Sequence, residues 1–313
     1  MSHSINKLDN QEELIMKTVG VIGLGNMGMG IAKNLIKNGF TTKGYDLFKV
    51  KREELKSNGG VPCASPAEVG KEADVVFVMV MNGQQALDVA FGQNGLAETM
   101  QPGSVVFLTA TIGMGFAQQL AKGLAEKGID MIDSGVSGGL SGAHNGTLTL
   151  MAAGKDEVYE RCVDVMQAIA KNLNHVGTEP GQGQVVKSCL QALIGTEFTT
   201  TFELLVMGAK AGVDPQVLLD VIKTSGGGFN NYENCVNLIM DRKFKDTGSA
   251  ITTMRKDLNI TLDLAREVGC YMPTTAQAKE LFQAGLTKFP DEDNWCIVKL
   301  FEDIAGTIVE RKK

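Results

Sequence analysis

The sequence has little material for a metal site or for structural cross-links. Its three histidines, His3, His144 and His175, are far apart and lack the spacing of metal ligands. We therefore expect no metal site and no histidine-based catalytic triad. The six cysteines are scattered and form no Cys-x-x-Cys pair, which predicts reduced and mostly buried thiols.

Long apolar runs and an excess of positive charge are also missing. The run "ADVVFVMVM", residues 73–81, has the length of a strand, whereas a membrane span needs about 18 residues. The formal net charge of −6 argues against a nucleic-acid surface. Residues 1–16 are polar and carry no apolar signal core. Together these features predict a cytoplasmic protein without a nucleic-acid or membrane partner.

The first half of the chain alternates short β-branched runs with helical patterns, as in a doubly wound parallel sheet of the Rossmann type. Runs that are continuously apolar suit strands that are buried on both faces of such a sheet. The expected strands are 17–23, 41–46, 73–80, 104–110, 128–134 and 147–154.

The character of the chain changes near residue 180. One long helical pattern runs from about residue 184 to the stop signal at Gly212, and shorter helical patterns follow. We expect a polar extension (1–16), an NAD-binding Rossmann domain (17–179) and an all-helical domain (180–313). The helical domain is expected to serve the substrate and to form the interface of a homodimer or homotetramer. The long helix joins the two domains.

A glycine-rich turn lies between the first strand and the first helix. Gly23, Gly25 and Gly28 form Gly-x-Gly-x-x-Gly, the pattern that lets backbone approach a pyrophosphate at a helix N-terminus. A glycine turn without a ligand is the alternative. The predicted cofactor contacts in this turn are Gly23, Leu24, Gly25, Asn26, Met27 and Gly28.

Asp46 ends the second expected strand, 23 residues after Gly23. A carboxylate there can accept hydrogen bonds from ribose hydroxyls and repels a ribose phosphate, which favours NAD over NADP. Three cations follow closely, Lys49, Lys51 and Arg52, and could weaken the preference for NAD over NADP. NADP is therefore the alternative cofactor.

Four motifs resemble the beta-hydroxyacid dehydrogenase family in order and spacing. They are "GLGNMGMGIAKNL" (23–35), "DSGVSGG" (133–139), "GQGQVVK" (181–187) and "RKDLNI" (255–260). The resemblance covers nearly the whole chain from about residue 17. It implies the Rossmann-plus-helical fold and a dehydrogenase that acts on a small hydroxy acid.

The resemblance also implies roles for particular residues. Lys187 matches the catalytic lysine, and Val80, Met81, Thr111 and Lys256 match positions that line the cofactor. The substrate carboxylate site corresponds to Ser137, Gly138 and Gly139.

The chemistry of Lys187 suits this role. An amine beside the substrate hydroxyl can exchange a proton as hydride moves, and partial burial or a neighbouring cation should lower its pKa enough for the neutral form to act. Without the other motifs, Lys187 would read as an ordinary lysine lying along a helix.

Gln191 departs from the asparagine of most family members, as Gly135 departs from a proline. Because residues four apart share a helical face, Gln191 should point the same way as Lys187, toward the substrate. Gln191 resembles the L-threonate dehydrogenase branch, and a neutral replacement is the alternative. The sequence thus predicts oxidation of a short hydroxy acid, L-threonate or a similar sugar acid, with hydroxyisobutyrate or tartronate semialdehyde chemistry and a non-catalytic nucleotide-binding module as alternatives.

Overall fold

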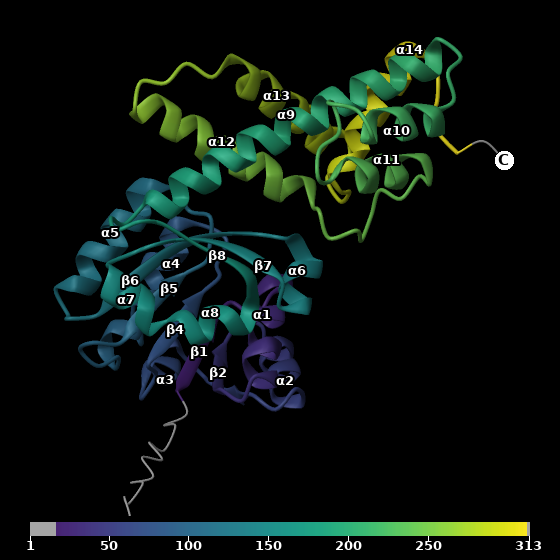
Figure 1. The fold of residues 1–313 in the computed structure, drawn as a ribbon. Coiled ribbons are helices and arrows are strands. Elements are labelled where there is room, and N and C mark those ends of the chain that lie inside the picture. The colour runs from purple at the N-terminus through teal and green to yellow at the C-terminus, as the bar shows by residue number, and fades with distance from the viewer. Residues whose placement is uncertain (1–16, 312–313) are drawn as a thin grey trace, which may run out of the picture.

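A computed structural model describes residues 17–311, so the expected polar extension 1–16 lies outside the described residues. The chain forms a twisted sheet that is flanked by helices, followed by a wholly helical part (Figure 1). The strands are β1 (Thr18–Ile22), β2 (Thr41–Tyr45), β3 (Val61–Pro62), β4 (Val75–Val78), β5 (Val105–Leu108), β6 (Asp130–Ser137), β7 (Leu148–Ala153) and β8 (Ala170–Gly177).

Helices cover both faces of this sheet. Those of the first half are α1 (Asn26–Lys37), α2 (Lys49–Ser57), α3 (Pro66–Gly70), α4 (Gly83–Phe91), α5 (Met114–Ala125), α6 (Gly139–Asn145), α7 (Asp156–Arg161) and α8 (Val163–Ile169), with a 3-10 turn η1 (Leu96–Glu98). One apolar cluster joins α1 and α8 to one face of the sheet, and a second joins α4 and α5 to the other.

The eight strands lie in the order β3-β2-β1-β4-β5-β6-β7-β8. Strands β1 to β6 are parallel to one another. Strand β7 is antiparallel to β6, and β8 is parallel to β7. The strand order reverses beside β1, and ligands of doubly wound sheets bind beyond the carboxyl ends of the strands at such a point. The predicted doubly wound fold is confirmed, with this reversed pair added at one edge.

Sequence reasoning did not predict β8. Its sequence, "AKNLNHVG", is largely polar, and half of its residues are exposed because β8 lies at one edge of the sheet. An edge strand with one open side lacks the continuous apolar run that marks the central strands.

The second half is helical, as predicted. Its elements are α9 (Gln182–Lys210), α10 (Pro215–Lys223), α11 (Tyr232–Met240), α12 (Ile251–Glu267), α13 (Pro273–Lys288), η2 (Asn294–Ile297) and α14 (Val298–Ala305). They enclose their own apolar cluster, in which Phe198 packs edge-on against Trp295 with ring centroids 5.1 Å apart.

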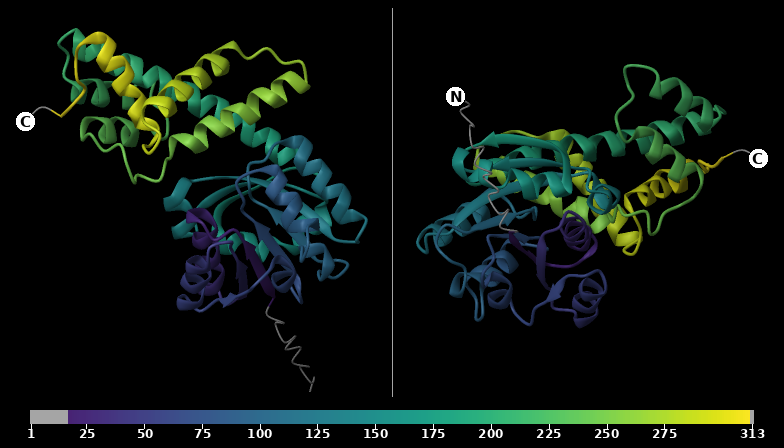
Figure 2. Two further views of the ribbon diagram at one scale, coloured as in Figure 1. Left: turned by 180° about the vertical axis from the view of Figure 1, so that it is seen from behind. Right: turned by 60° about the horizontal axis from the view of Figure 1, so that its bottom comes forward.

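The 29-residue helix α9 connects the two parts. It begins against the sheet and ends deep in the helical part, and the view from behind shows the same path (Figures 1 and 2). Among residues 17–311, none of the helices combines the length and the apolar character needed to cross a bilayer. All six cysteines are free; four are buried, and Cys189 and Cys270 are exposed.

Candidate active site

The glycine turn after β1 packs tightly at two positions and is open at the third. A Cβ at Gly23 would lie 2.2 Å from the Met79 carbonyl oxygen, and one at Gly28 would lie 1.8 Å from the Gly23 oxygen. A Cβ at Gly25 would meet nothing within 4 Å. Gly28 therefore allows α1 to pack closely on the end of β1, Gly23 allows the turn to approach the segment after β4, and Gly25 leaves open space in front of the turn.

The backbone N–H groups in the first turn of α1 are available as hydrogen-bond donors in that space. Within residues 17–311, no side chain accepts from the first-turn amides of α1, where Asn26 and Met27 lie. Unsatisfied amides at a helix N-terminus attract anionic oxygen. This turn therefore fits the pyrophosphate of a dinucleotide.

Asp46 lies directly after β2 and is held by two backbone amides. Its Oδ2 accepts from Leu24 N at 2.7 Å, and its Oδ1 accepts from Phe48 N at 2.9 Å. The carboxylate is thus fixed beside the glycine turn, where a ribose would follow the pyrophosphate.

The three cations after Asp46 are already engaged. Lys49 pairs with Glu53 at 3.5 Å and Lys51 pairs with Glu54 at 3.0 Å. Arg52 donates to the main-chain oxygen of Asp46. A ribose phosphate would have to compete for each of them.

Three of the predicted cofactor residues lie just beyond the carboxyl ends of β4 and β5. Val80 is half-buried, Met81 is 61% exposed and Thr111 is half-buried. Lys256 of α12 donates from Nζ to the Thr111 carbonyl oxygen at 2.8 Å. The helical part therefore reaches across to the loop after β5.

Lys187 lies near the start of α9 and is almost fully buried, with 8% of its surface exposed. Its Nζ donates to Gln191 Oε1 at 3.0 Å, one helical turn further along. The amide of Gln191 donates in turn from Nε2 to Asp257 Oδ2 at 2.7 Å. Lys187 and Gln191 therefore share one helical face, as the spacing predicts, and that face meets α12.

Asp257 is a residue that sequence reasoning did not single out. It is buried, and its Oδ1 lies 3.0 Å from Lys256 Nζ. The available signal was its position beside Lys256 in the "RKDL" motif. Its carboxylate lies between two lysines and holds the amide that contacts Lys187.

Strand β6 brings the serine-glycine motif to the same helix. A Cβ at Gly135 would lie 2.6 Å from Lys187 Cβ, so Lys187 packs directly on this strand. Side chains alternate along a strand, which puts Ser137 on the same face as Gly135. Gly138 and Gly139 follow at the start of α6 with φ of +123° and +59°, and both are exposed.

Burial lowers the pKa of the Lys187 amine, and the neighbouring Lys256 lowers it further, whereas Asp257 raises it. An ammonium that has lost its hydration shell is disfavoured relative to the neutral amine. The direction agrees with the sequence-based expectation. A buried amine with a lowered pKa can both accept and return a proton.

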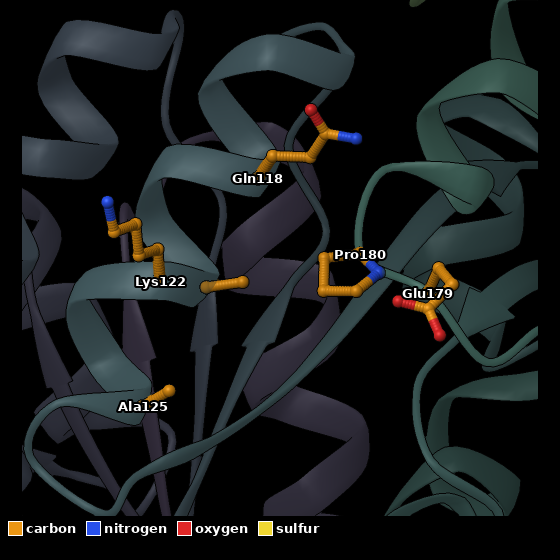
Figure 3. A pocket seen from close by; sticks show the side chains of 6 residues that line it. Gln118, Lys122, Ala125, Glu179 and Pro180 are labelled. Atoms are coloured by element: carbon orange, nitrogen blue, oxygen red, sulfur yellow. The ribbon is translucent and has the colours of Figure 1, made fainter.

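A surface hollow lies elsewhere on the molecule. Its volume is about 480 Å³, and Figure 3 shows it between α5 and the segment before α9, lined by Gln118, Ala121, Lys122, Ala125, Glu179 and Pro180. The lining contains none of the predicted site residues.

Comparison with known proteins places these features in a family. Residues 18–177 match the family model described as the NAD binding domain of 6-phosphogluconate dehydrogenase. Residues 181–301 match the model described as NAD-binding of NADP-dependent 3-hydroxyisobutyrate dehydrogenase.

Individual relatives cover almost the whole chain. An L-threonate dehydrogenase of Cupriavidus necator is 40% identical over 92% of this chain and 97% of its own length. A 2-(hydroxymethyl)glutarate dehydrogenase of Eubacterium barkeri is 32% identical over 93% and 97%. The crystal structure of a 3-hydroxyisobutyrate dehydrogenase from Salmonella typhimurium superposes with a TM-score of 0.82 at 31% identity, covering 91% of this chain and 99% of that one.

The fold, the dinucleotide turn and these matches define an NAD(P)-dependent hydroxyacid dehydrogenase. The open space at Gly25 and the uncapped start of α1 fit that cofactor. The chain belongs to the beta-hydroxyacid dehydrogenase family, which confirms the resemblance seen in its motifs.

Proposed function

We propose that this protein oxidises the hydroxyl of a short sugar acid, L-threonate or a close analogue, at the carbon next to the carboxylate. Lys187 is the general base in this direction and the general acid in the reverse one. The observation that carries the proposal is the buried Lys187 amine, hydrogen-bonded to Gln191 at 3.0 Å on a helix that packs against the serine-glycine strand.

The proton follows a short path in this proposal. The neutral Lys187 amine takes the proton of the substrate hydroxyl while a hydride leaves the carbon that carries this hydroxyl, so the alcohol becomes a ketone. Bound NAD supplies the acceptor for that hydride. In the reverse direction the Lys187 ammonium polarises the carbonyl and returns the proton.

The substrate carboxylate binds at the junction between β6 and α6 in this proposal. Ser137 offers a hydroxyl, and the amides of Gly138 and Gly139 can converge on an anion as a backbone nest does. The positive φ values of both glycines suit such a turn. Ser137 follows Gly135 on the strand face against which Lys187 packs, so the carboxylate and the hydroxyl to be oxidised can lie side by side.

The preference for a polyhydroxylated acid rests on Gln191. Its Oε1 accepts from Lys187 and its Nε2 donates to Asp257, so an amide that can contact a substrate hydroxyl lies beside the amine. The 40% identity to the L-threonate dehydrogenase of Cupriavidus necator supports this choice. The Gly23–Gly28 turn, Val80, Met81, Thr111 and Lys256 are the proposed contacts for the cofactor.

NAD is the proposed cofactor in preference to NADP. The Asp46 carboxylate is fixed beside the glycine turn, where it repels a ribose phosphate, and Lys49, Lys51 and Arg52 have partners within the chain.

The helical part is proposed to form a homodimer or homotetramer. Along α9, Leu193 is 57% exposed and Met207 is 70% exposed, and Val217 and Val221 of α10 are exposed by 52% and 57%. These exposures leave large apolar side chains on two successive helices of this part open to a partner subunit. Light scattering of the purified protein tests this, and a single monomeric species contradicts it.

The experiment that tests the proposed reaction is a screen of NAD reduction over L-threonate, D-threonate, glycerate, hydroxyisobutyrate and tartronate. The proposal predicts the highest kcat/KM with a four-carbon sugar acid. Highest activity on hydroxyisobutyrate assigns the site to that chemistry instead. NADH binding without turnover on any acid makes the protein a nucleotide-binding module.

A further inference from the structure

Gln184 lies one turn before Lys187 on α9 and is completely buried. Its Oε1 accepts from the backbone amides of Ile112 at 2.8 Å and Gly113 at 3.1 Å. Its Nε2 donates to the Ala110 carbonyl at 3.1 Å and to Asp133 Oδ1 at 2.6 Å. A side-chain amide has two donors and two acceptor positions, so every hydrogen-bonding position of Gln184 is used.

Asp133 at β6 determines which way this amide points. Its Oδ2 accepts from the backbone amides of Gly181 and Gln184, both at 3.1 Å, while Oδ1 faces the Gln184 side chain. An ionised carboxylate only accepts, so Gln184 must turn its Nε2 toward Asp133. Its Oε1 is then directed at the amides of the 110–113 loop.

The start of α9 has no room to shift in this arrangement. A Cβ at Gly183 would lie 2.5 Å from the Asp133 carbonyl oxygen and 2.6 Å from that of Met151. The helix backbone therefore rests directly on β6 and β7. The two amides that Asp133 binds belong to the start of α9, where a carboxylate is favourable.

The 110–113 loop is held by side chains from both long helices. Gln184 of α9 binds its Ala110 carbonyl and its Ile112 and Gly113 amides, and Lys256 of α12 binds its Thr111 carbonyl. Thr111 is one of the proposed cofactor contacts. The position of this loop relative to Lys187 is therefore set through a buried amide rather than through the solvent.

We propose that Gln184 is a positioning residue, which fixes the distance between the Lys187 amine and the cofactor-lining loop 110–113. This proposal rests on the proposed function, since that distance matters only if Lys187 and the cofactor act on one substrate. Proton and hydride transfer depend on geometry to a fraction of an ångström, and a misplacement of about 1 Å costs roughly 100-fold in rate.

A swap of donors and acceptors tests the arrangement. Gln184→Glu sets a second carboxylate against Asp133, and Asp133→Asn sets an amide nitrogen against either the backbone donors or Gln184. In the double variant, the amide introduced at position 133 donates to the carboxylate introduced at position 184, which still accepts from Ile112 and Gly113. Only the hydrogen bond to the Ala110 carbonyl is then missing, because a carboxylate has no donor for it. We expect each single variant to lose about 100-fold in kcat with little change in the KM for NAD, and the double variant to regain at least about tenfold.

Gln182→Met and Gln184→Met form a matched pair, because Gln182 lies two residues away on the same helix and is exposed. Only Gln184→Met should lower kcat. Hydrogen exchange gives a readout without turnover: the Ile112 and Gly113 amides should be protected in the wild type and in Gln182→Met, and should exchange faster in Gln184→Met.

Two results would overturn the positioning role. One is rapid exchange of the Ile112 and Gly113 amides in the wild-type protein, which does not require any variant to fold. The other is a double variant that is no more active than the worse single variant. A wild-type protein without turnover on any hydroxy acid would instead defeat the proposed function, and the exchange measurement would still report on the hydrogen bonds of Gln184.

Discussion

The Lys187 amine donates to the Gln191 amide oxygen at 3.0 Å, and both side chains are buried on one face of α9. The orientation of that amide is determined by Asp257, because a carboxylate accepts only from the Nε2 side at 2.7 Å. The amine thus has a fixed acceptor that is itself held from a second helix. A lysine with several rotatable bonds is restrained in this way near one position.

Replacing Asp257 with asparagine should alter the titration of Lys187. Asp257 raises the pKa of the amine, so removing its charge lowers that pKa further, and the rise of kcat/KM with pH in the oxidation direction moves to lower pH. The loss of a charged, buried hydrogen bond should also reduce the free energy of unfolding by about 2 kcal/mol. Asp263→Asn, on the same helix but exposed, is the control, and identical pH profiles for the two variants would rule out the coupling.

Shortening Gln191 should reduce the preference for sugar acids. In Gln191→Asn the amide can no longer span from Lys187 to Asp257, so its oxygen is no longer fixed. We expect kcat/KM for L-threonate to fall about tenfold, as for one lost hydrogen bond, with a smaller fall for hydroxyisobutyrate. Equal losses on both acids would show that Gln191 does not contribute to specificity.

Asp46→Ala should narrow the discrimination between the two cofactors. The loss of a charged hydrogen bond to the ribose should raise the KM for NAD about tenfold, and the KM for NADP should fall because the repulsion is gone. Asp74→Ala removes a carboxylate that accepts from Thr18 N at the opposite end of β1 and serves as the control. An unchanged ratio of kcat/KM for NAD and NADP would show that Asp46 does not contact the ribose.

Asp133 should make stability depend on pH in a narrow window. Burial raises the pKa of this carboxyl to about 6, although hydrogen bonds from Gln184 and Gly181 oppose the rise. Between about pH 4 and pH 6 the folded protein binds the proton that the unfolded chain has released, so the free energy of unfolding falls as pH rises. The contribution is about 3 kcal/mol across the window.

Urea unfolding of the wild type and Asp133→Asn at about pH 4.5, 5.5 and 6.5 measures this contribution. Asparagine does not titrate, so the variant should lose less stability than the wild type between the lowest and the highest pH. Parallel pH dependences for the two proteins would show that Asp133 does not titrate there.

The sequence predicts the strands well where both faces of the sheet are covered by helices. Strands such as β4 and β5 are continuous apolar runs, and Gly23 and Gly25 lie between β1 and α1 as the dinucleotide turn requires. The exposed edge strand β8 carries no such signal. Strands β6 and β7 are consecutive in the chain and pair antiparallel, and the apolar run of a strand does not encode its direction in the sheet.

The same division applies to the site. Lys187 and Gln191 could be placed together from their four-residue spacing alone, because that spacing is a property of every α-helix. Asp257 and Gln184 could not, because their roles come from packing of α12 and α9 against other segments. Both lie inside the motifs "RKDL" and "GQGQ", but only the fold shows what their side chains contact.

The proton-transfer role of Lys187 is tested most directly by the pre-steady-state rate of NADH formation in Lys187→Met, with Lys210→Met at the exposed end of α9 as the control. The account predicts a loss of about 100-fold to 10,000-fold in the hydride-transfer rate for Lys187→Met, with the dissociation constant for NADH unchanged. A Lys187→Met variant that forms NADH as fast as Lys210→Met would contradict it.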